Sequence, residues 1–328
     1  MRKYIQKKSL ISFLMLAYAA YAGDVSICLW RGRNPEKVLS KYRNTYFGDV
    51  VVMNDKGESL IVNRIDIEDY LAGVLSKEMD SSWPVEALKA QAVVSRTFTV
   101  YTSNMNRAKN LCYDIENSIF HQVYSPSNCD KIIAAVRETR GEVLTCGGEV
   151  SQAFFHATCG GCTASPSDVW GGNSYENIVC VKDEYCENTP YCRWKKTFTT
   201  GQLSKMFSEL KATDIIDRIT VEETDMSGRV KLLKIWLKNG NITNLTGHKF
   251  RMEINESAPK VLFNRPDIIP STNFKVLQTG GKFVFEGAGY GHGVGMCQWG
   301  ARVMAERGYD YRQILKHYFP RMEVTRID

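Results

Sequence analysis

The sequence predicts an α+β fold, with helices and strands mixed along the chain and a smaller β-rich subdomain inserted into it. Three observations support this class. The region from residue 25 alternates apolar and polar side chains, as strands do. Residues 67–103 then carry apolar side chains at helical spacing in two consecutive segments. Residues 197–270 return to short strand-like runs, separated by Ser-Gly and Asn-Gly turns.

The N-terminal half is expected to place strands before helices. Residues 25–32 (VSICLWRG) predict a first strand, and residues 48–66 predict a hairpin with an Asn-Asp-Lys-Gly turn. A helix follows over residues 67–79. Pro84 opens the next helix, because a proline at the first helical position loses no hydrogen bond. Alanines and other small residues in that helix allow close packing against neighbouring elements.

Strands become more frequent in the second half. A helix from residue 130 is followed by a turn at Gly141 and by strands around Gly147 and Gly148. A short helix, TTGQLSKMFSEL, precedes the hairpins of the insertion, and the chain closes with a strand, a glycine-rich loop and a helix. The sequence therefore predicts a core in two parts, residues 23–196 and 271–328. Residues 197–270 form the subdomain inserted between them.

Residues 1–22 are typical of a secretory signal peptide. Four basic residues precede an apolar run over residues 10–20, and Ala-Tyr-Ala then offers small residues for cleavage. The run is short for a bilayer span, although an uncleaved anchor is the alternative. Both predict an exported protein of the periplasm or cell envelope. Without this segment the net charge of +6 falls near neutral, which argues against a nucleic-acid partner.

Ten cysteines in an exported chain indicate disulfides or metal ligands. Half of them crowd into one stretch, namely Cys159, Cys162, Cys180, Cys186 and Cys192. Cys159-x-x-Cys162 resembles half of a zinc site, which His156 and the later cysteines could complete. One or two disulfides tying down a loop explain the same pattern, so the sequence leaves zinc and disulfides both open.

Glu78 stands near the end of the helix over residues 67–79, just before a Ser-Ser-Trp-Pro break. A negative charge near a helix C-terminus is disfavoured by the helix dipole, so this position requires another reason. Trp83 and the proline after it can desolvate the carboxylate, which favours the protonated form that a general acid needs. Gln91 and Arg96 of the next helix are candidates to orient it. The alternative is an ordinary solvated glutamate.

The loop over residues 287–295 has glycine at every second position and frames His292. Such a loop lets backbone approach a ligand closely and offers unhindered N–H groups. It matches neither a Walker loop nor a dinucleotide fingerprint. The alternative is a tightly packed corner of a sheet, with His292 as a structural hydrogen-bonding residue.

Four stretches together resemble the SpoIID/LytB family, the stage II sporulation protein D type of peptidoglycan lytic transglycosylase. They are residues 67–98 (IEDYLAGVLSKEMDSSWPVEALKAQAVVSRTF), 121–125 (HQVYS), 154–170 (FFHATCGGCTASPSDVW) and 287–320 (GAGYGHGVGMCQWGARVMAERGYDYRQILKHYFP). The resemblance extends over nearly the whole chain after the signal and implies a SpoIID-like mixed helix and strand core.

The family implies cleavage of the β-1,4 bond between N-acetylmuramic acid and N-acetylglucosamine without water. One carboxyl group suffices if it first protonates the leaving oxygen and then accepts a proton from the attacking 6-hydroxyl. By motif position, Glu78 is the implied catalytic residue. The residues implied to bind the glycan are Gln91, Arg96, His156, Cys159, His292, Gly293 and Gln298.

The resemblance also implies partners and cofactors. Substrates would be peptidoglycan strands without stem peptides, so an amidase that removes those peptides is the expected functional partner, in division or in sporulation-like engulfment. No cofactor is needed for the chemistry, and a structural zinc with unknown ligands is an additional expectation. Some relatives hold zinc near the element that contains His121, where the family often has cysteine. Cys159 and Cys297 stand where many members have serine. A non-catalytic glycan-binding protein, or an amidase activator of the LytB type, is the alternative function.

Overall fold

The computed structural model describes residues 23–118, 121–172, 175–207, 214–257 and 268–327. The predicted signal peptide over residues 1–22 lies outside them. The chain forms two compact units. Unit 1 comprises residues up to Ala153 with Asp310–Arg312 and Met322–Asp328, and unit 2 comprises Phe154–Tyr309 with Gln313–Arg321. Helices and strands alternate in both units, which confirms the α+β class.

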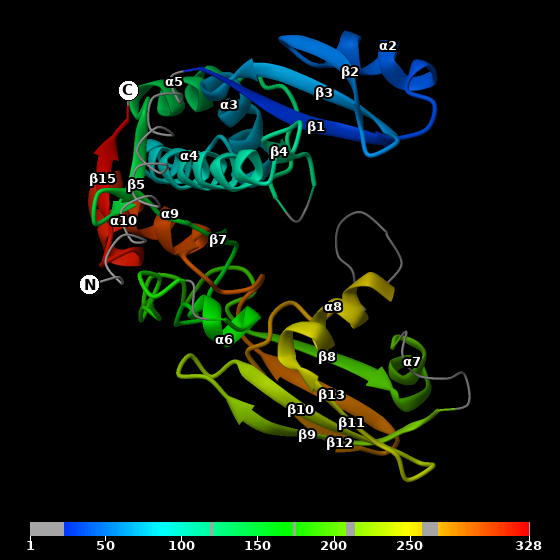
Figure 1. Ribbon diagram of the computed structural model, residues 1–328. Helices are drawn as coiled ribbons and strands as arrows, with labels where there is room; N and C mark the ends of the chain where they lie inside the picture. The colour runs from blue at the N-terminus through cyan, green and yellow to red at the C-terminus, as the bar shows by residue number, and fades with distance from the viewer. Residues whose placement is uncertain (1–22, 119–120, 173–174, 208–213, 258–267, 328) are drawn as a thin grey trace, which may run out of the picture. The chain divides into compact units, whose positions relative to one another are not determined.

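Unit 1 contains two sheets and a group of helices (Figure 1). The first sheet has the order β2-β3-β1-β4, and the second has the order β15-β5-β6. The strands are β1 (Asp24–Gly32), β2 (Asp49–Asp55), β3 (Glu58–Asp66), β4 (Ile115–Glu116), β5 (Glu142–Cys146), β6 (Glu149–Val150) and β15 (Glu323–Arg326). The helices are α2 (Glu36–Thr45), α3 (Ile67–Glu78), α4 (Val85–Ala108) and α5 (Asp130–Glu138).

Local chemistry explains most of these elements. The predicted hairpin is β2 and β3, joined through Lys56 and Gly57, which both have positive φ as a tight hairpin turn requires. Asp66 caps α3 by accepting the N–H of Glu68 at 2.8 Å. Pro84 is the N-cap residue of α4, one position before the first helical position at which the sequence had placed it. The helix α2 was not predicted: its apolar side is narrow, with Val38, Leu39 and Tyr42 only partly buried and no residue fully buried.

Unit 2 contains two three-stranded sheets, β12-β13-β8 and β11-β10-β9, and a short parallel pair, β14-β7. Its strands are β7 (Phe155–His156), β8 (Trp194–Thr199), β9 (Ile216–Thr224), β10 (Val230–Leu237), β11 (Ile242–Thr246), β12 (Phe274–Thr279), β13 (Lys282–Gly287) and β14 (Met296–Cys297). Its helices are α6 (Pro166–Trp170), α7 (Thr200–Lys205), α8 (Gly247–Ser257) and α9 (Gln298–Glu306), and α10 (Tyr311–Tyr318) contributes its later residues.

In its described part, the segment over residues 197–270 shares one apolar core with β8 and the last hairpin. Phe250 of α8 packs in one apolar cluster with Phe198 of β8 and with Phe274 and Phe285 of the last hairpin. Figure 1 shows α8 beside β10 and β11, which it contacts. The strands predicted from the Ser-Gly and Asn-Gly turns are present as β9, β10 and β11. Within the described residues, no helix has the length and apolar character of a membrane span.

Candidate functional site

Glu78 is the last residue of α3 and is half-buried. The helix ends because Met79 adopts an extended conformation, while its N–H still bonds to the carbonyl of Leu75 at 2.9 Å. Asp80 then makes a tight turn by accepting the N–H of Ser82 at 2.8 Å, and Trp83 is buried. The break between the two helices is thus a defined turn anchored by a buried tryptophan, and it fixes the position of the Glu78 backbone.

A buried tyrosine lies two helical turns before Glu78. The hydroxyl of Tyr70 is completely buried and donates to Oε1 of Gln122 at 3.1 Å. Burial raises the pKa of Tyr70 well above its usual value, and the charges of Tyr124 and Glu78 raise it further. The charge of the Glu78 carboxylate therefore reaches the buried hydroxyl of Tyr70 and contributes to its raised pKa.

Gln91 belongs to the same buried network. Its Nε2 donates to Oγ of Ser95 at 3.0 Å, while Gln122 accepts from Thr99 at 2.9 Å and donates to the carbonyl of Ser95 at 3.3 Å. Gln122 comes from the HQVYS element, so this motif connects to α3 and α4 through side chains. Sequence reasoning missed Tyr70 and Gln122; their presence inside the quoted motifs was the available signal.

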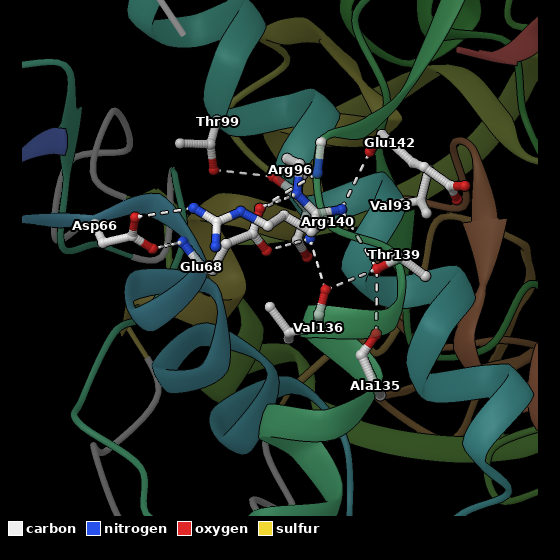
Figure 2. Close-up of polar contacts among 12 residues, drawn as sticks. Asp66, Glu68, Val93, Arg96, Thr99, Ala135, Val136, Thr139, Arg140 and Glu142 are labelled. Atoms are coloured by element: carbon white, nitrogen blue, oxygen red, sulfur yellow. Dashed lines mark hydrogen bonds and ion pairs between the residues drawn. The ribbon is translucent and has the colours of Figure 1, made fainter. Parts of the chain in front are cut away.

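Arg96 forms a buried ion pair with Glu68 (Figure 2). Its Nε donates to Glu68 at 3.0 Å, and its Nη atoms reach Thr139 and the carbonyls of Val136 and Glu142. Only 1% of the Arg96 side chain is exposed. All three guanidinium nitrogens thus have partners inside unit 1, so Arg96 holds α3, α4 and α5 together and is not among the glycan contacts that we propose below.

The glycine-rich loop of unit 2 follows β13 and packs onto the segment that begins at β7. Gly289, Gly291, Gly293 and Gly295 all have positive φ. A side chain on Gly289 would come within 2.8 Å of the carbonyl oxygen of Thr158, and one on Gly295 would overlap that of Phe154. The alternating glycines therefore serve close backbone packing, which was one of the two interpretations of this loop.

The loop brings His292 next to His156, with ring centroids 5.7 Å apart. Nδ1 of His156 contacts the carbonyl of Val294 at 3.1 Å, so it carries the proton and leaves Nε2 as an acceptor. Nδ1 of His292 instead accepts the N–H of Val294 at 3.0 Å, which leaves Nε2–H as a donor in the neutral ring. The two imidazoles thus present opposite hydrogen-bonding character.

Both rings are neutral at physiological pH. Burial lowers the pKa of His292 to about 3, with further contributions from the charges of Arg251 and Arg229. Burial also lowers the pKa of His156, helped by His292 and Arg229. Nε2 of His156 is buried and has no hydrogen-bond partner among the described residues. A neutral pair of this kind can recognise uncharged polar groups such as hydroxyls and amides.

Trp170, at the end of α6, completes an aromatic surface beside His292. Its ring centroid lies 5.2 Å from that of His292 and 4.8 Å from that of Phe154. Trp170 also lies 6.5 Å from the ring of His248, and it is 38% exposed, which is unusual for a tryptophan beside three other rings. The sequence-based site omitted Trp170, although it is the last residue of the FFHATCGGCTASPSDVW motif.

The remaining predicted site residues have clear positions in unit 2. Gly293 accepts the N–H of Ala164 at 2.7 Å, and Gln298 is the mostly buried first residue of α9. Cys159 is completely buried, and its thiol contacts Cys186. Glu78, Gln91 and Arg96 belong to unit 1, and the other predicted residues belong to unit 2.

The donor atoms near His121 bear on the zinc expected there. Nδ1 of His121 accepts the N–H of Glu116 at 3.0 Å. Among the described residues, no group of three or more metal-binding side chains forms around it, because the single such group lies in unit 2. The described residues near His121 therefore do not by themselves supply the ligand set of a zinc site.

Comparisons with known proteins show which family the chain belongs to. A family model described as stage II sporulation protein matches residues 55–146, which include Glu78 and Gln122. An uncharacterized protein of Brachyspira hyodysenteriae is 32% identical over 284 residues, covering 85% of this chain and 72% of that protein. The stage II sporulation protein D of Bacillus subtilis is 26% identical over 283 residues, covering 81% and 76%. The chain belongs to the SpoIID family.

This SpoIID-family chain also resembles the amidase enhancer of Bacillus subtilis, with 28% identity over 302 residues. That match covers 78% of the chain but only 40% of the enhancer. A second model, described as a domain of unknown function (DUF8618), matches residues 171–295, which lie within unit 2. The two models thus fall on the two structural units, with the SpoIID model on unit 1.

Proposed function

We propose that this SpoIID-family protein is a peptidoglycan lytic transglycosylase with Glu78 as its catalytic residue. Family membership and the relatives named above support a function at the cell wall. The position of Glu78 supports its assignment as the catalytic residue. It lies at a helix end fixed by a tight turn, and its charge raises the pKa of the buried Tyr70. A carboxyl group partly withdrawn from water is suited to proton transfer.

The reaction needs a single carboxyl group. Glu78, protonated, gives its proton to the oxygen that links N-acetylmuramic acid to N-acetylglucosamine, and positive charge develops at the muramic acid anomeric carbon. The 6-hydroxyl of the same sugar attacks that carbon, and the Glu78 carboxylate accepts the hydroxyl proton. The product is a 1,6-anhydro ring and no water is consumed, in contrast to the two-carboxylate hydrolases.

Unit 2 supplies candidate glycan contacts. The Nε2–H of His292 is a donor suited to a sugar hydroxyl or an acetamido carbonyl, and the exposed ring of Trp170 offers a flat apolar surface for a sugar ring. We propose that the backbone of Gly293 and the side chain of Gln298 also contact the glycan. The substrate class is peptide-free glycan, and the proposed functional partner is an amidase in the cell envelope.

The test is product analysis with a matched pair of variants. Purified protein is incubated with peptide-free glycan strands, and the products are identified by mass spectrometry. Wild type is expected to release fragments that end in 1,6-anhydro-muramic acid, and Glu78→Gln should reduce that product at least ~100-fold, in the range of general acid–base contributions. Glu138→Gln is the control, because Glu138 also ends a helix but is exposed.

Two results would contradict this proposal. Fragments with free reducing ends would indicate hydrolysis by water. Equal product from wild type and Glu78→Gln would remove Glu78 from the chemistry. A loss of activity in Glu138→Gln equal to that in Glu78→Gln would show that the assay reports folding.

The likeness to an amidase enhancer favours a second candidate, a non-catalytic activator of a peptidoglycan amidase. In that case the protein should increase amidase turnover on intact peptidoglycan, and Glu78→Gln should increase it equally well. Measuring amidase rates with wild type and with Glu78→Gln separates the two functions, because the transglycosylase needs the carboxylate and an activator does not.

A further inference from the structure

Four metal-binding side chains meet in the interior of unit 2. They are Cys159, Asp183, Cys186 and Cys297, and one donor atom of each lies within 4.8 Å of the others. Sγ of Cys159 is 3.1 Å from Sγ of Cys186 and 3.1 Å from Oδ2 of Asp183. All four residues are buried. They form a compact set of three sulfurs and one carboxylate oxygen.

Backbone N–H groups point at the sulfurs of two of the four residues, Cys159 and Cys297. The backbone N–H groups of Gly161 and Cys159 point to Sγ of Cys159 and of Cys297 respectively, each at 3.3 Å. The N–H of Gly300 also points to Sγ of Cys297 at 3.3 Å. Such hydrogen bonds strengthen when a sulfur becomes a thiolate, as it does when it binds a metal ion.

The carboxylate is held in place by a second layer of contacts. Tyr318 is completely buried and donates its hydroxyl to Oδ2 of Asp183 at 2.9 Å, while Oδ1 accepts the N–H of Tyr185 at 2.9 Å. A side chain on Gly300 would collide with Tyr318 and Asp183. Partners of this kind orient the ligands of metal sites and keep their geometry.

We propose that Cys159, Asp183, Cys186 and Cys297 bind a structural zinc ion in tetrahedral geometry. Three thiolates and one carboxylate make a complete four-ligand set, and thiolate-rich tetrahedral sites select zinc over harder cations. Zinc binding releases the thiol protons. The ion then supplies the positive charge that offsets the cost of burying the thiolates and the carboxylate.

The ligands come from three separate segments. Cys159 follows β7, Asp183 and Cys186 lie in the long connection between α6 and β8, and Cys297 ends β14. That connection has no regular strand or helix in its described part, and backbone hydrogen bonds at Val181, Asp183 and Tyr191 join it to other segments. A zinc ion fixes this segment and secures β14 to β7, directly after the glycine-rich loop that carries His292.

Cys162 and Cys180 are separate from this cluster and supply the control. Their Sγ atoms are 2.6 Å apart, and neither belongs to the four-residue group. A cysteine change there removes a sulfur from the same unit without touching a proposed ligand.

The test measures the zinc content of the purified full-length protein by inductively coupled plasma mass spectrometry. We expect about one zinc per chain in wild type, loss of most of it in Cys186→Ser, and retention in Cys162→Ser. Asp183→Cys should retain zinc, because a fourth thiolate replaces the carboxylate. Replacement of zinc by Co²⁺ should give the visible bands of tetrahedral cobalt and sulfur-to-cobalt charge-transfer absorption.

The competing outcome is a Cys159–Cys186 disulfide. It would appear as a cross-linked peptide in a non-reduced digest of the wild-type protein as purified, and it would overturn the proposal. Zinc that persists in Cys186→Ser, or that is lost in Cys162→Ser, would also overturn it. If Cys186→Ser does not fold, the wild-type zinc content, the cobalt spectrum and the Asp183→Cys result decide the question.

Discussion

Glu68 and Arg96 illustrate, at the residue scale, how a charged side chain in a motif can serve the interior. Their ion pair is almost completely buried, and Arg96 has three further acceptors at its Nη atoms. Removing one partner leaves an uncompensated charge away from water, which is far less favourable than losing an exposed pair. The contribution of Arg96 to folding therefore explains why it stands in the motif. Glu78, by contrast, is only half-buried, at the end of its helix.

Glu68→Gln should destabilise unit 1 by about 3–5 kcal/mol, because it leaves the Arg96 guanidinium buried without a counter-charge. The measurement is urea-induced unfolding, together with hydrogen exchange of the α3 and α4 amides. The comparison variant is Arg140→Ala, whose 3.8 Å contact with Asp66 is exposed. That change should alter the unfolding free energy by about 0.5 kcal/mol or less. Similar effects from both variants would contradict this account.

At the element scale, the glycine-rich loop is held by the segment on which it lies. Its positive φ angles select glycine, and the neighbouring backbone of Phe154 and Thr158 leaves no space for a Cβ atom. Gly293 lies against the guanidinium of Arg229, which is buried and donates to the carbonyl of Cys159 at 2.6 Å. The loop conformation that orients His292 is thus determined by packing on both sides.

Gly295→Ala should destabilise unit 2 by more than about 2 kcal/mol, because the left-handed backbone penalty adds to a clash with the Phe154 carbonyl. Gly281→Ala is a matched control: its φ of 72° is close to the 74° of Gly295, but its Cβ would meet open space. That variant should lose only about 1 kcal/mol. Chemical denaturation of both proteins gives the comparison, and equal losses would rule out the packing explanation.

At the scale of the whole molecule, the histidines share one electrostatic property. The chain has five, and burial lowers the pKa of each: His121, His156, His248, His292 and His317. In the unfolded chain they take up protons near pH 6.5. The folded protein therefore binds fewer protons than the unfolded chain below that pH, and acid shifts the equilibrium toward unfolding.

Stability should fall as the pH drops from about 6.5, and for His292 the loss should continue to about pH 3. Each histidine that stays neutral contributes up to about 1.4 kcal/mol per pH unit. Unfolding free energies at pH 7, 6, 5 and 4 provide the measurement, on chelator-treated protein so that metal loss does not contribute. His292→Asn should show a shallower dependence. A flat profile between pH 6.5 and pH 5 would contradict the prediction.

The sequence by itself determined most of the elements, α2 excepted, and the motifs. Apolar periodicity defined α3, turn residues defined the hairpins, and the motif stretches led to the SpoIID family. These signals are local, since each depends on residues a few positions apart. For the same reason the helix break and the surrounding motif are sufficient to indicate Glu78 as a candidate.

Only the tertiary structure decided what lies beside each candidate. Cys159 and Cys297 are 138 positions apart, yet the N–H of one contacts the sulfur of the other. Spacing along the chain groups Cys159 with neighbouring cysteines, while the fold brings it to Asp183, Cys186 and Cys297. The fold likewise assigned Arg96 to the interior and placed Trp170 beside His292. Contacts of this kind depend on strand pairing and side-chain packing between distant segments, which local sequence patterns do not encode.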